Sequence, residues 1–286
     1  MSLAYLNGNY RPLAEMQVSV MDRGFLFGDG VYEVIPVYAR KPFRLQEHLQ
    51  RLQNSLSATR ITNPHSDAEW GAIIAQLIDS APSDDQQVYL QVTRGAAPVR
   101  NHAFPEGVVP TVFVMTDPLL PPSPELLTTG TAAVSAIDIR WLRCDIKATS
   151  LLANCLLRQA SVDAGCAETV LFRDGMLTEG AASNIFVVKN GGVLASQKNH
   201  LMLPGITYDV ILEICRQHNI PCTVRDITEA EVRDADELLM TSSTREVQPV
   251  VQLDGRSIGS GKPGPMAQTM AARYQEFKRT VMYGKA

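Results

Sequence analysis

The sequence of 286 residues lacks the features that mark several common classes of protein. No apolar run approaches the roughly 20 residues that a membrane-spanning helix needs. The first residues show no basic segment followed by an apolar one, so no signal peptide is predicted. The formal net charge is −4, with both signs mixed along the chain, whereas binding to nucleic acid or a membrane surface favours a basic face. We therefore expect a cytoplasmic protein with neither kind of partner.

Cysteine and the common catalytic motifs are equally scarce. The chain has five cysteines, an odd number, and no CxxC pair, which argues against a disulfide framework or a zinc site and favours a reducing compartment. The five histidines lack metal-ligand spacing, so no metal is expected. The motifs HExxH and the phosphate loop GxxxxGK are absent, while GxSxG and GxGxxG each occur once, within the overlapping glycine-rich stretch at 255–264. Phosphoryl-transfer and zinc enzymes thus lack their usual marks here.

The chain does have enough apolar residues for a large core, because 45% of its residues are hydrophobic. A segment at 117–124 holds four prolines in eight positions. Proline fixes φ and has no backbone donor, so neither a helix nor a central strand is expected there. We interpret this segment as a linker between a first domain at 1–116 and a second at 125–286, both of ordinary domain size.

Hydrophobic periodicity predicts helices and strands in both parts. In the first, we expect helices at 44–59 and 68–78 and strands at 31–37, 88–92 and 111–115. In the second, we expect strands at 131–139, 168–172, 184–189, 237–241 and 247–252 and helices at about 150–164, 206–218 and 265–280. The Asp174-Gly175 and Asn190-Gly191 turns favour hairpins, and Thr228 with Glu231 matches a capping box. Strands and helices mixed without strict alternation predict an α+β fold.

One of the seven lysines is placed differently from the rest. Lys147 lies between an expected strand and an expected buried helix, whereas most of the others lie beside turns or near an end of the chain. Desolvation lowers the pKa of an amine and makes it a nucleophile toward carbonyls. The alternative is a lysine whose stem lies along the surface while its charge stays in water. The pattern alone leaves both readings open.

Several stretches, taken in order, resemble one family. They are Asp22-Arg23-Gly24-Phe25-Leu26-Phe27-Gly28-Asp29-Gly30-Val31-Tyr32-Glu33-Val34, Glu47-His48-Leu49-Gln50-Arg51-Leu52, Gln91-Val92-Thr93-Arg94-Gly95, Arg140-Trp141-Leu142-Arg143-Cys144-Asp145-Ile146-Lys147, Thr178-Glu179-Gly180, Ser183-Asn184-Ile185-Phe186, Gly205-Ile206-Thr207 and Thr241-Ser242-Ser243-Thr244. Together they cover nearly the whole chain and resemble the fold-type IV pyridoxal-phosphate aminotransferases, nearest to the D-amino-acid (D-alanine) pattern. The resemblance implies a small α+β N-terminal domain, a larger pseudo-barrel domain that carries the Schiff-base lysine, and pyridoxal 5′-phosphate between them.

The resemblance also implies roles for residues that would hold the cofactor. Lys147 matches the Schiff-base lysine, which also moves the proton during transfer. Glu179 matches the carboxylate that faces the pyridine nitrogen; from the residues alone it is a turn carboxylate. The remaining matches are Arg51, Ile206, Thr207 and Ser243 around the phosphate and Leu203 on the cofactor ring. A helix that opens at Ile206 would offer free N–H groups to an anion, while Arg51 alone would be an ordinary surface arginine.

For the substrate, the resemblance implies a group that holds its α-carboxylate. Tyr32, Arg100 and His102 match this group, and arginine binds carboxylates in a two-pronged geometry. Arg100-Asn101-His102 lies in an expected loop, where the ordinary reading is a solvated charge. In the family this loop reaches the active site of the partner subunit, so a homodimer is implied. The implied reaction is a ping-pong transamination between a D-amino acid, such as D-alanine, and a 2-oxo acid, such as 2-oxoglutarate.

The chain departs from the nearest pattern at several positions. One extra residue lies between Gly95 and Arg100, and alanines replace serines after the Thr178-Glu179-Gly180 stretch. Tyr208 stands where arginine is usual, and Arg245 replaces a smaller residue. The last two changes would alter either the side-chain preference or surface contacts. The departures that follow Glu179 are Ala181 and Ala182.

Other activities on the same fold remain open from the sequence. A branched-chain L-amino-acid aminotransferase would need a different carboxylate site, which the Arg100 and His102 pair argues against. An (R)-amine transaminase would lack a fixed carboxylate site, and an aminodeoxychorismate lyase would use the same lysine for elimination. A cofactor-binding protein without activity is disfavoured, because Lys147, Glu179 and Arg51 are all present.

Overall fold

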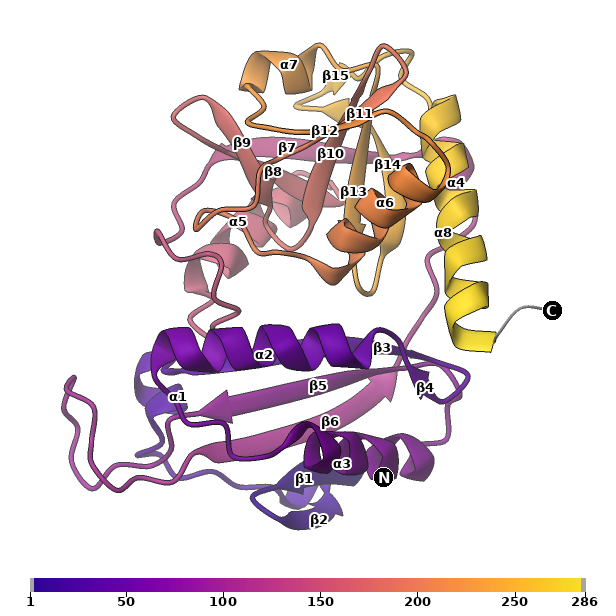
Figure 1. Cartoon of the computed structure of the whole chain (residues 1–286). Helices are drawn as coiled ribbons and strands as arrows, with labels where there is room; N and C mark the ends of the chain where they lie inside the picture. The colour runs from indigo at the N-terminus through magenta and orange to yellow at the C-terminus, as the bar shows by residue number, and fades with distance from the viewer. Residues whose placement is uncertain (1–2, 284–286) are drawn as a thin grey trace. The chain divides into compact units, whose positions relative to one another are not determined.

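The computed structural model describes residues 3–283, so only the outermost residues of the two expected domains lie outside it. The chain divides into two compact units, 1–120 with 146–151, and 121–145 with 152–286. The division at 120/121 falls inside the proline-rich segment. The short return at 146–151 carries Lys147 and clusters with the first unit, whereas the sequence expectation assigned it to the second domain. Figure 1 shows the elements of both units.

The first unit is an antiparallel sheet with both of its long helices packed into one core. Its strands run in the order β2-β1-β6-β5-β3-β4, and their bounds are β1 Leu3–Leu6, β2 Asn9–Pro12, β3 Gly30–Tyr38, β4 Lys41–Pro42, β5 Gln86–Thr93 and β6 Thr111–Pro118. The helices are η1 Leu13–Glu15, α1 Arg23–Phe27, α2 Leu45–Thr59 and α3 Asp67–Ser80. The predicted helices and strands of this part are all present, while β1, β2, β4, η1 and α1 were not predicted.

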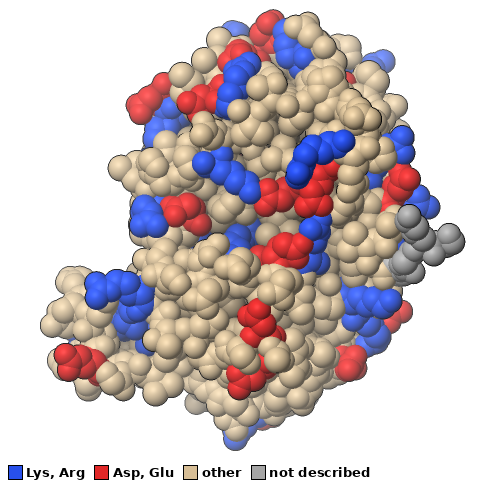
Figure 2. Space-filling view, viewed as in Figure 1, with Lys and Arg blue, Asp and Glu red and all other residues tan. Residues whose placement is uncertain are grey.

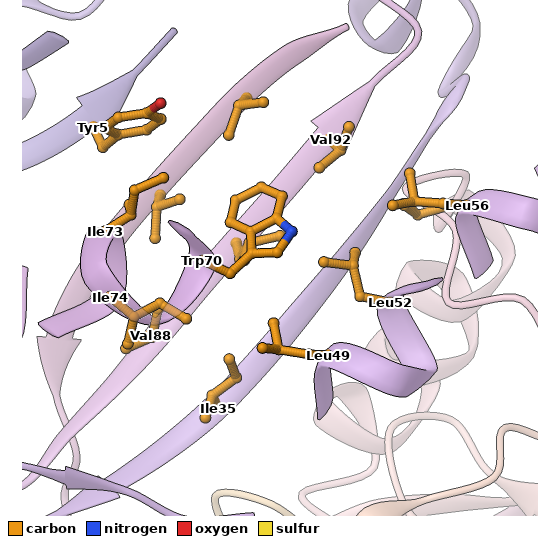
Figure 3. Packing of buried hydrophobic residues seen from close by; sticks show 14 of the residues in the cluster. Tyr5, Ile35, Leu49, Leu52, Leu56, Trp70, Ile73, Ile74, Val88 and Val92 are labelled. Carbon is orange, nitrogen blue, oxygen red and sulfur yellow. The ribbon is translucent and has the colours of Figure 1, made fainter. Parts of the chain in front are cut away.

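The core of the first unit lies on one face of this sheet. Leucines of α2 and isoleucines of α3 form a single buried cluster with alternate residues of β3, β5 and β6, as Figure 3 shows around Trp70. Strand side chains alternate between the two faces, so the helix-covered face takes Val31 and Ile35 while Tyr32 points to the other face. This alternation decides which residues of β3 are available for a functional site.

The second unit is built on a mixed sheet of nine strands. The order is β12-β11-β10-β13-β14-β7-β8-β9, with β15 also paired to β14. The strands are β7 Thr131–Ile137, β8 Glu168–Arg173, β9 Met176–Gly180, β10 Asn184–Lys189, β11 Gly192–Ala195, β12 Cys222–Val224, β13 Glu237–Ser242, β14 Glu246–Leu253 and β15 Arg256–Ser257. The sheet curls, because Leu177 of β9, at one end of the strand order, and Val187 of β10, near the other, belong to one buried cluster. The prediction of an α+β fold with a pseudo-barrel second part is confirmed.

Helices cover the outside of this curled sheet (Figure 1). They are α4 Leu126–Thr129, α5 Leu152–Asp163, α6 Ile206–Gln217, α7 Glu229–Arg233 and α8 Pro265–Tyr283. The capping box at Thr228 and Glu231 is confirmed at the start of α7. The Asp174-Gly175 turn joins β8 to β9, a strand the sequence did not predict, and Asn190-Gly191 joins β10 to β11. Both turns have positive φ at each residue, as hairpin turns of this length require.

Charge is spread rather than gathered on the visible surface. Figure 2 shows lysine and arginine interspersed with aspartate and glutamate on this face. Within residues 3–283, no helix is both long and apolar enough to cross a membrane. Among the same residues, no group of three or more His, Cys, Asp or Glu is arranged to hold a metal ion.

Candidate active site

Lys147 lies on a short extended segment that continues the sheet of the first unit. Tyr32 N–H donates to the Lys147 carbonyl at 2.9 Å, and Ala148 pairs with Val31. Ile146 and Ala148 therefore pack into the helix-covered core, and the alternation sends Lys147 to the opposite face beside Tyr32. Its Nζ lies 4.2 Å from the centre of the Tyr32 ring, so two of the predicted site residues are in contact.

The helix after Lys147 differs from the expectation of a buried helix. In α5 the buried residues are Leu157 and Ser161, and Leu152 and Leu156 are exposed. The position of Lys147 is therefore set by its pairing with β3, and by its N–H donating to Ser55 Oγ at 3.2 Å, rather than by a buried α5.

Arg51 is buried, which excludes the ordinary surface arginine. Its Nε and Nη2 donate to the two carboxylate oxygens of Glu33, each at 2.8 Å. Glu33 also binds His48 Nδ1 at 2.8 Å. Burial opposes the charge on Glu33, but Arg51 lowers the pKa of this carboxyl to about 2. The carboxylate therefore stays ionised and fixes one edge of the Arg51 guanidinium.

Sequence reasoning gave Glu33 and His48 no role, although a signal was present. Glu33 shares a strand face with Val31 and Ile35, and a charge on an apolar face needs a buried partner. His48 lies one helical turn before Arg51 on α2, so both reach the same carboxylate. His48 Nε2 has no hydrogen-bond partner within residues 3–283.

Arg100 and His102 lie on the connection between β5 and β6, as expected for a loop. Their side chains are exposed. The Arg100 guanidinium lies 4.9 Å from the centre of the Phe27 ring, and the His102 ring lies 5.3 Å from the same ring. The structure thus brings these two predicted residues together on Phe27, while Tyr32 lies on β3 with Lys147.

In the second unit, Glu179 is a buried residue of β9, not a turn carboxylate. Its carboxylate accepts hydrogen bonds from Arg140 Nη1, from Asn184 Nδ2 at 3.1 Å and from the Leu203 N–H at 3.1 Å. Burial raises the pKa of Glu179 to about 7, against the opposing effect of Arg140. Three donors surround this buried carboxylate, so its orientation is fixed. Because the local dielectric is low, a neighbouring charge has a strong effect on the pKa of Glu179.

Residues 203–207 combine an apolar residue with a helix N-terminus. Leu203 is partly buried and its N–H is the donor to Glu179. Gly205 is the N-cap of α6, and no side chain caps the first turn. Ile206 and Thr207 follow as its first two residues, and such uncapped N–H groups favour an anion. Ser243 lies in the turn between β13 and β14.

The residues that depart from the nearest family pattern lie in different surroundings, some buried and some exposed. Tyr208 is fully buried, stacks on Phe186 with ring centres 5.1 Å apart, and donates to the Ser196 carbonyl at 2.8 Å. It is a core residue, so it does not change surface contacts. Arg245 donates to the Ala167 carbonyl at 2.9 Å and lies 3.9 Å from Glu168. Ala181 is buried and Ala182 is exposed.

Known proteins match this chain over most of its length. A model of the amino-transferase class IV family matches residues 30–253. The chain belongs to the class IV aminotransferases. A D-alanine aminotransferase of Bacillus licheniformis is 40% identical over 269 residues, which cover 94% of each chain. One of Staphylococcus haemolyticus is 34% identical over 97% of this chain and 98% of its own.

The fold agrees with solved class IV aminotransferases. The branched-chain amino acid aminotransferase of Escherichia coli has a TM-score of 0.88 at 23% identity, and the likeness covers 100% of this chain and 96% of the other. A further branched-chain amino acid aminotransferase, solved with pyridoxamine 5′-phosphate, has a TM-score of 0.89 at 25% identity over 99% of this chain and 95% of its own. The fold-type IV architecture expected from the sequence is therefore confirmed, and the family uses pyridoxal phosphate as its cofactor.

Proposed function

We propose that this aminotransferase moves the amino group of a D-amino acid, such as D-alanine, to a 2-oxo acid, such as 2-oxoglutarate. The observation that carries the donor class is the pair Arg100 and His102, which lie together on the ring of Phe27 at the end of α1. The curated relatives named D-alanine aminotransferase support the same choice. An exposed arginine beside a histidine suits a carboxylate ligand, because guanidinium binds it with two parallel hydrogen bonds.

The residues present fit pyridoxal 5′-phosphate in their chemistry. The cofactor carries an aldehyde, a ring nitrogen and a phosphate, and when bound it withdraws electrons from the substrate carbon. Lys147 is the amine for the aldehyde, and Glu179 is a buried carboxylate suited to a protonated ring nitrogen. The uncapped start of α6 suits the phosphate.

Each residue then has a stated task. Lys147 would hold the aldehyde and move the proton that leaves and returns to the substrate carbon. Glu179 would face the ring nitrogen and favour its protonated form, and Leu203 would lie beside the ring. Arg51, Ile206, Thr207 and Ser243 would hold the phosphate. Glu33 serves this task indirectly, since it holds the Arg51 guanidinium in one orientation.

Tyr32, Arg100 and His102 are proposed to hold the α-carboxylate of the substrate. Tyr32 lies against Lys147, so a substrate bound beside its hydroxyl has its amine near the reacting lysine. Arg100 and His102 would come from the partner subunit, as the family resemblance implies. The stereochemistry of the donor follows from which side of the cofactor the carboxylate is held.

A homodimer is part of this proposal, and the first unit offers a surface for it. Val20, Phe25, Val99 and Val109 are each at least 70% exposed. They lie on two segments that an Asp22–Ala96 bridge joins. Large exposed apolar side chains gathered on neighbouring segments mark protein contacts. We assign this surface to a second copy of the chain, because the same segments carry Arg100 and His102.

The dimer can be tested separately from the chemistry. Val109→Asp should shift the sedimentation of the holoenzyme toward the monomer and lower turnover, because burying a charge in an apolar contact is costly. Val224→Asp, at an exposed residue of β12 in the second unit, is the control and should leave the assembly unchanged. An unchanged dimer in Val109→Asp would exclude this surface. The proposed setting is the cytoplasm, which agrees with five free thiols.

The test of the function is a comparison of amino donors. Purified holoenzyme is given D-alanine, L-alanine, L-leucine or 1-phenylethylamine with 2-oxoglutarate, and the 2-oxo products and glutamate are measured. Strong turnover of D-alanine alone is expected. Preference for L-leucine would instead make it a branched-chain enzyme, preference for the amine an amine transaminase, and release of product without glutamate a lyase.

A further inference from the structure

The loop that carries Arg100 and His102 has almost no backbone pairing of its own. Within residues 94–110, all of which the structure describes, one isolated bridge is the only ladder contact. Figure 1 shows this connection beyond the ends of β5 and β6. Residues 98–104 are exposed. Such a loop needs another source of order if its side chains are to bind a small carboxylate with defined geometry.

The buried side chain of Arg23 holds the backbone of this loop in place. It is only 3% exposed, and its guanidinium donates to three consecutive carbonyls. Nη1 donates to the Asn101 carbonyl at 2.5 Å and to the Ala103 carbonyl at 3.3 Å, and Nη2 donates to the His102 carbonyl at 3.2 Å. A buried cation that contacts three successive carbonyls defines the path of the backbone on both sides of His102.

Arg23 is itself held by a second layer of contacts. Its Nε donates to Asp29 at 2.7 Å, and Asp29 also binds Arg94 through both oxygens at 2.8 and 3.0 Å. Arg94 extends the same support to the far end of the loop, since its guanidinium lies 3.6 Å from the centre of the Phe104 ring. Asp22 caps α1 by accepting from the Gly24 N–H at 2.8 Å.

Phe27, one turn after Arg23 on α1, contacts the side chains of the loop. Arg23 and Arg100 each lie within 5 Å of the centre of its ring, and His102 is the third neighbour. A cation over an aromatic face gains roughly 0.5–2 kcal/mol, depending on its exposure. Arg23 thus sets the backbone while Phe27 sets the direction of the Arg100 and His102 side chains.

We infer that Arg23 and Phe27 are positioning residues for the substrate-carboxylate site, an inference that rests on the proposed function. Neither residue needs to touch the substrate. They hold Arg100 and His102 at the separation that a carboxylate requires, and so they set the affinity for amino acids over amines. The rate of the chemical step at Lys147 does not depend on them directly.

The variant that tests this is Arg23→Lys. Lysine keeps the charge near Asp29, but its single ammonium cannot reach three carbonyls in the plane of a guanidinium. We expect KM for D-alanine to rise by about tenfold, because one to two charge-assisted hydrogen bonds are lost. The kcat should stay within about twofold of the wild type. The visible absorbance of the holoenzyme should be unchanged, because Lys147 and Glu179 are untouched.

The matched control is Arg40→Lys. Arg40 makes the same kind of contact in the same unit, with Asp84 through Nε and with the Ile78 and Ala81 carbonyls, but it lies away from the loop. Its KM for D-alanine should equal that of the wild type. A KM for Arg23→Lys that also stays within twofold of the wild type would overturn the inference, as would an equal loss in both variants.

A second variant keeps the test decisive if Arg23→Lys does not fold. Phe27→Leu removes the aromatic face and leaves the backbone contacts of Arg23 in place, and it should raise KM for D-alanine by about threefold. An unchanged KM in a folded Phe27→Leu enzyme would overturn the inference. Failure of the proposed function is seen beforehand and separately, because the wild-type enzyme would then not turn over D-alanine.

Discussion

Arg140 joins Glu179 to Asp138, with one edge of its guanidinium on each carboxylate. Its Nε and Nη2 donate to the two oxygens of Asp138 at 2.9 Å, while Nη1 donates to Glu179. All three side chains are buried. Because burial raises the pKa of Glu179 to about 7, the charge of this carboxylate depends on Arg140. A neutral Glu179 could not hold a protonated ring nitrogen.

Replacing Arg140 by glutamine should therefore lower the rate and move its pH dependence. Without the guanidinium the pKa of Glu179 rises further, so the acid limb of the kcat profile should move to higher pH. We expect kcat at pH 7 to fall by about 10²-fold. Arg143→Gln is the control, since Arg143 pairs with Asp145 on the exposed side of the same segment. If the acid limb of the Arg140→Gln profile stayed at the wild-type pH, Arg140 would not control the charge of Glu179.

Lys147→Ala should abolish multiple turnover while leaving the fold intact. In the proposed function the lysine would hold the cofactor aldehyde and carry the proton, and loss of both tasks should cost at least about 10³-fold in rate. The yellow colour of the holoenzyme should also disappear. Lys189→Ala is the matched control, because Lys189 pairs with Asp234 at the surface of the second unit. Normal turnover in Lys147→Ala would show that another amine does the chemistry.

Glu33→Gln should weaken the protein at neutral pH and remove part of its acid sensitivity. The pKa of Glu33 is about 2 in the folded chain, against 4.5 for an ordinary glutamate side chain. The unfolded state therefore binds more protons between these values, so the wild type should lose on the order of 3 kcal/mol as pH falls from 4.5 to 2. The glutamine variant lacks this contribution throughout.

The measurement is the free energy of unfolding by urea at a series of pH values. The curves of wild type and Glu33→Gln should approach each other as pH falls through that window. Glu47→Gln is the control, since Glu47 forms a partly exposed pair with Arg44 and should change stability by less than about 1 kcal/mol. If the unfolding free energies of wild type and Glu33→Gln stayed parallel as pH falls, Glu33 would not be ionised beside Arg51 in the folded protein.

The sequence predicted the long elements because their periodic patterns are local. The leucine stripe of α2 and the alternation in β5 each span several turns or pairs. By contrast, α1 is a single turn, and its caps Asp22 and Gly28 are too short a signal for periodicity. Local patterns also cannot predict which strands pair. For example, β7 lies between β14 and β8 and is parallel to both, and such pairing depends on contacts between distant parts of the chain.

The candidate site shows the same division. The resemblance named Lys147 and Glu179, but neither motif nor spacing could tell that Lys147 contacts Tyr32 or that Arg140 contacts Glu179. Each contact joins a strand residue to a residue of the segment between β7 and α5. The contact of Lys147 also depends on register, since a one-residue slip would turn Lys147 into the core. Arg23 lies within a stretch that matches the family but received no role, because its loop partners are backbone carbonyls, which every sequence has.

Gly205→Ala should disturb the cofactor site through a neighbour rather than through the backbone. The φ of Gly205 is −66°, which alanine adopts readily, but a Cβ there would lie 2.1 Å from Asn184 Oδ1. Asn184 would have to move, and with it the hydrogen bonds to Glu179 and the Leu203 carbonyl. We expect stability to fall by about 1–3 kcal/mol and affinity for pyridoxal phosphate to fall by about tenfold.

Cofactor titration of the apoenzyme, followed by absorbance, measures this affinity. Gly71→Ala is the control: it lies within α3, and apart from its chain neighbours and the backbone of its own helix, no described heavy atom comes within 4 Å of its added Cβ. Alanine there should raise stability by about 0.5–1 kcal/mol, because glycine is costly inside a helix, and leave the cofactor affinity unchanged. If Gly205→Ala bound the cofactor as tightly as Gly71→Ala, the position of Asn184 would not matter for the site, and Glu179 would be held by Arg140 and the Leu203 N–H alone.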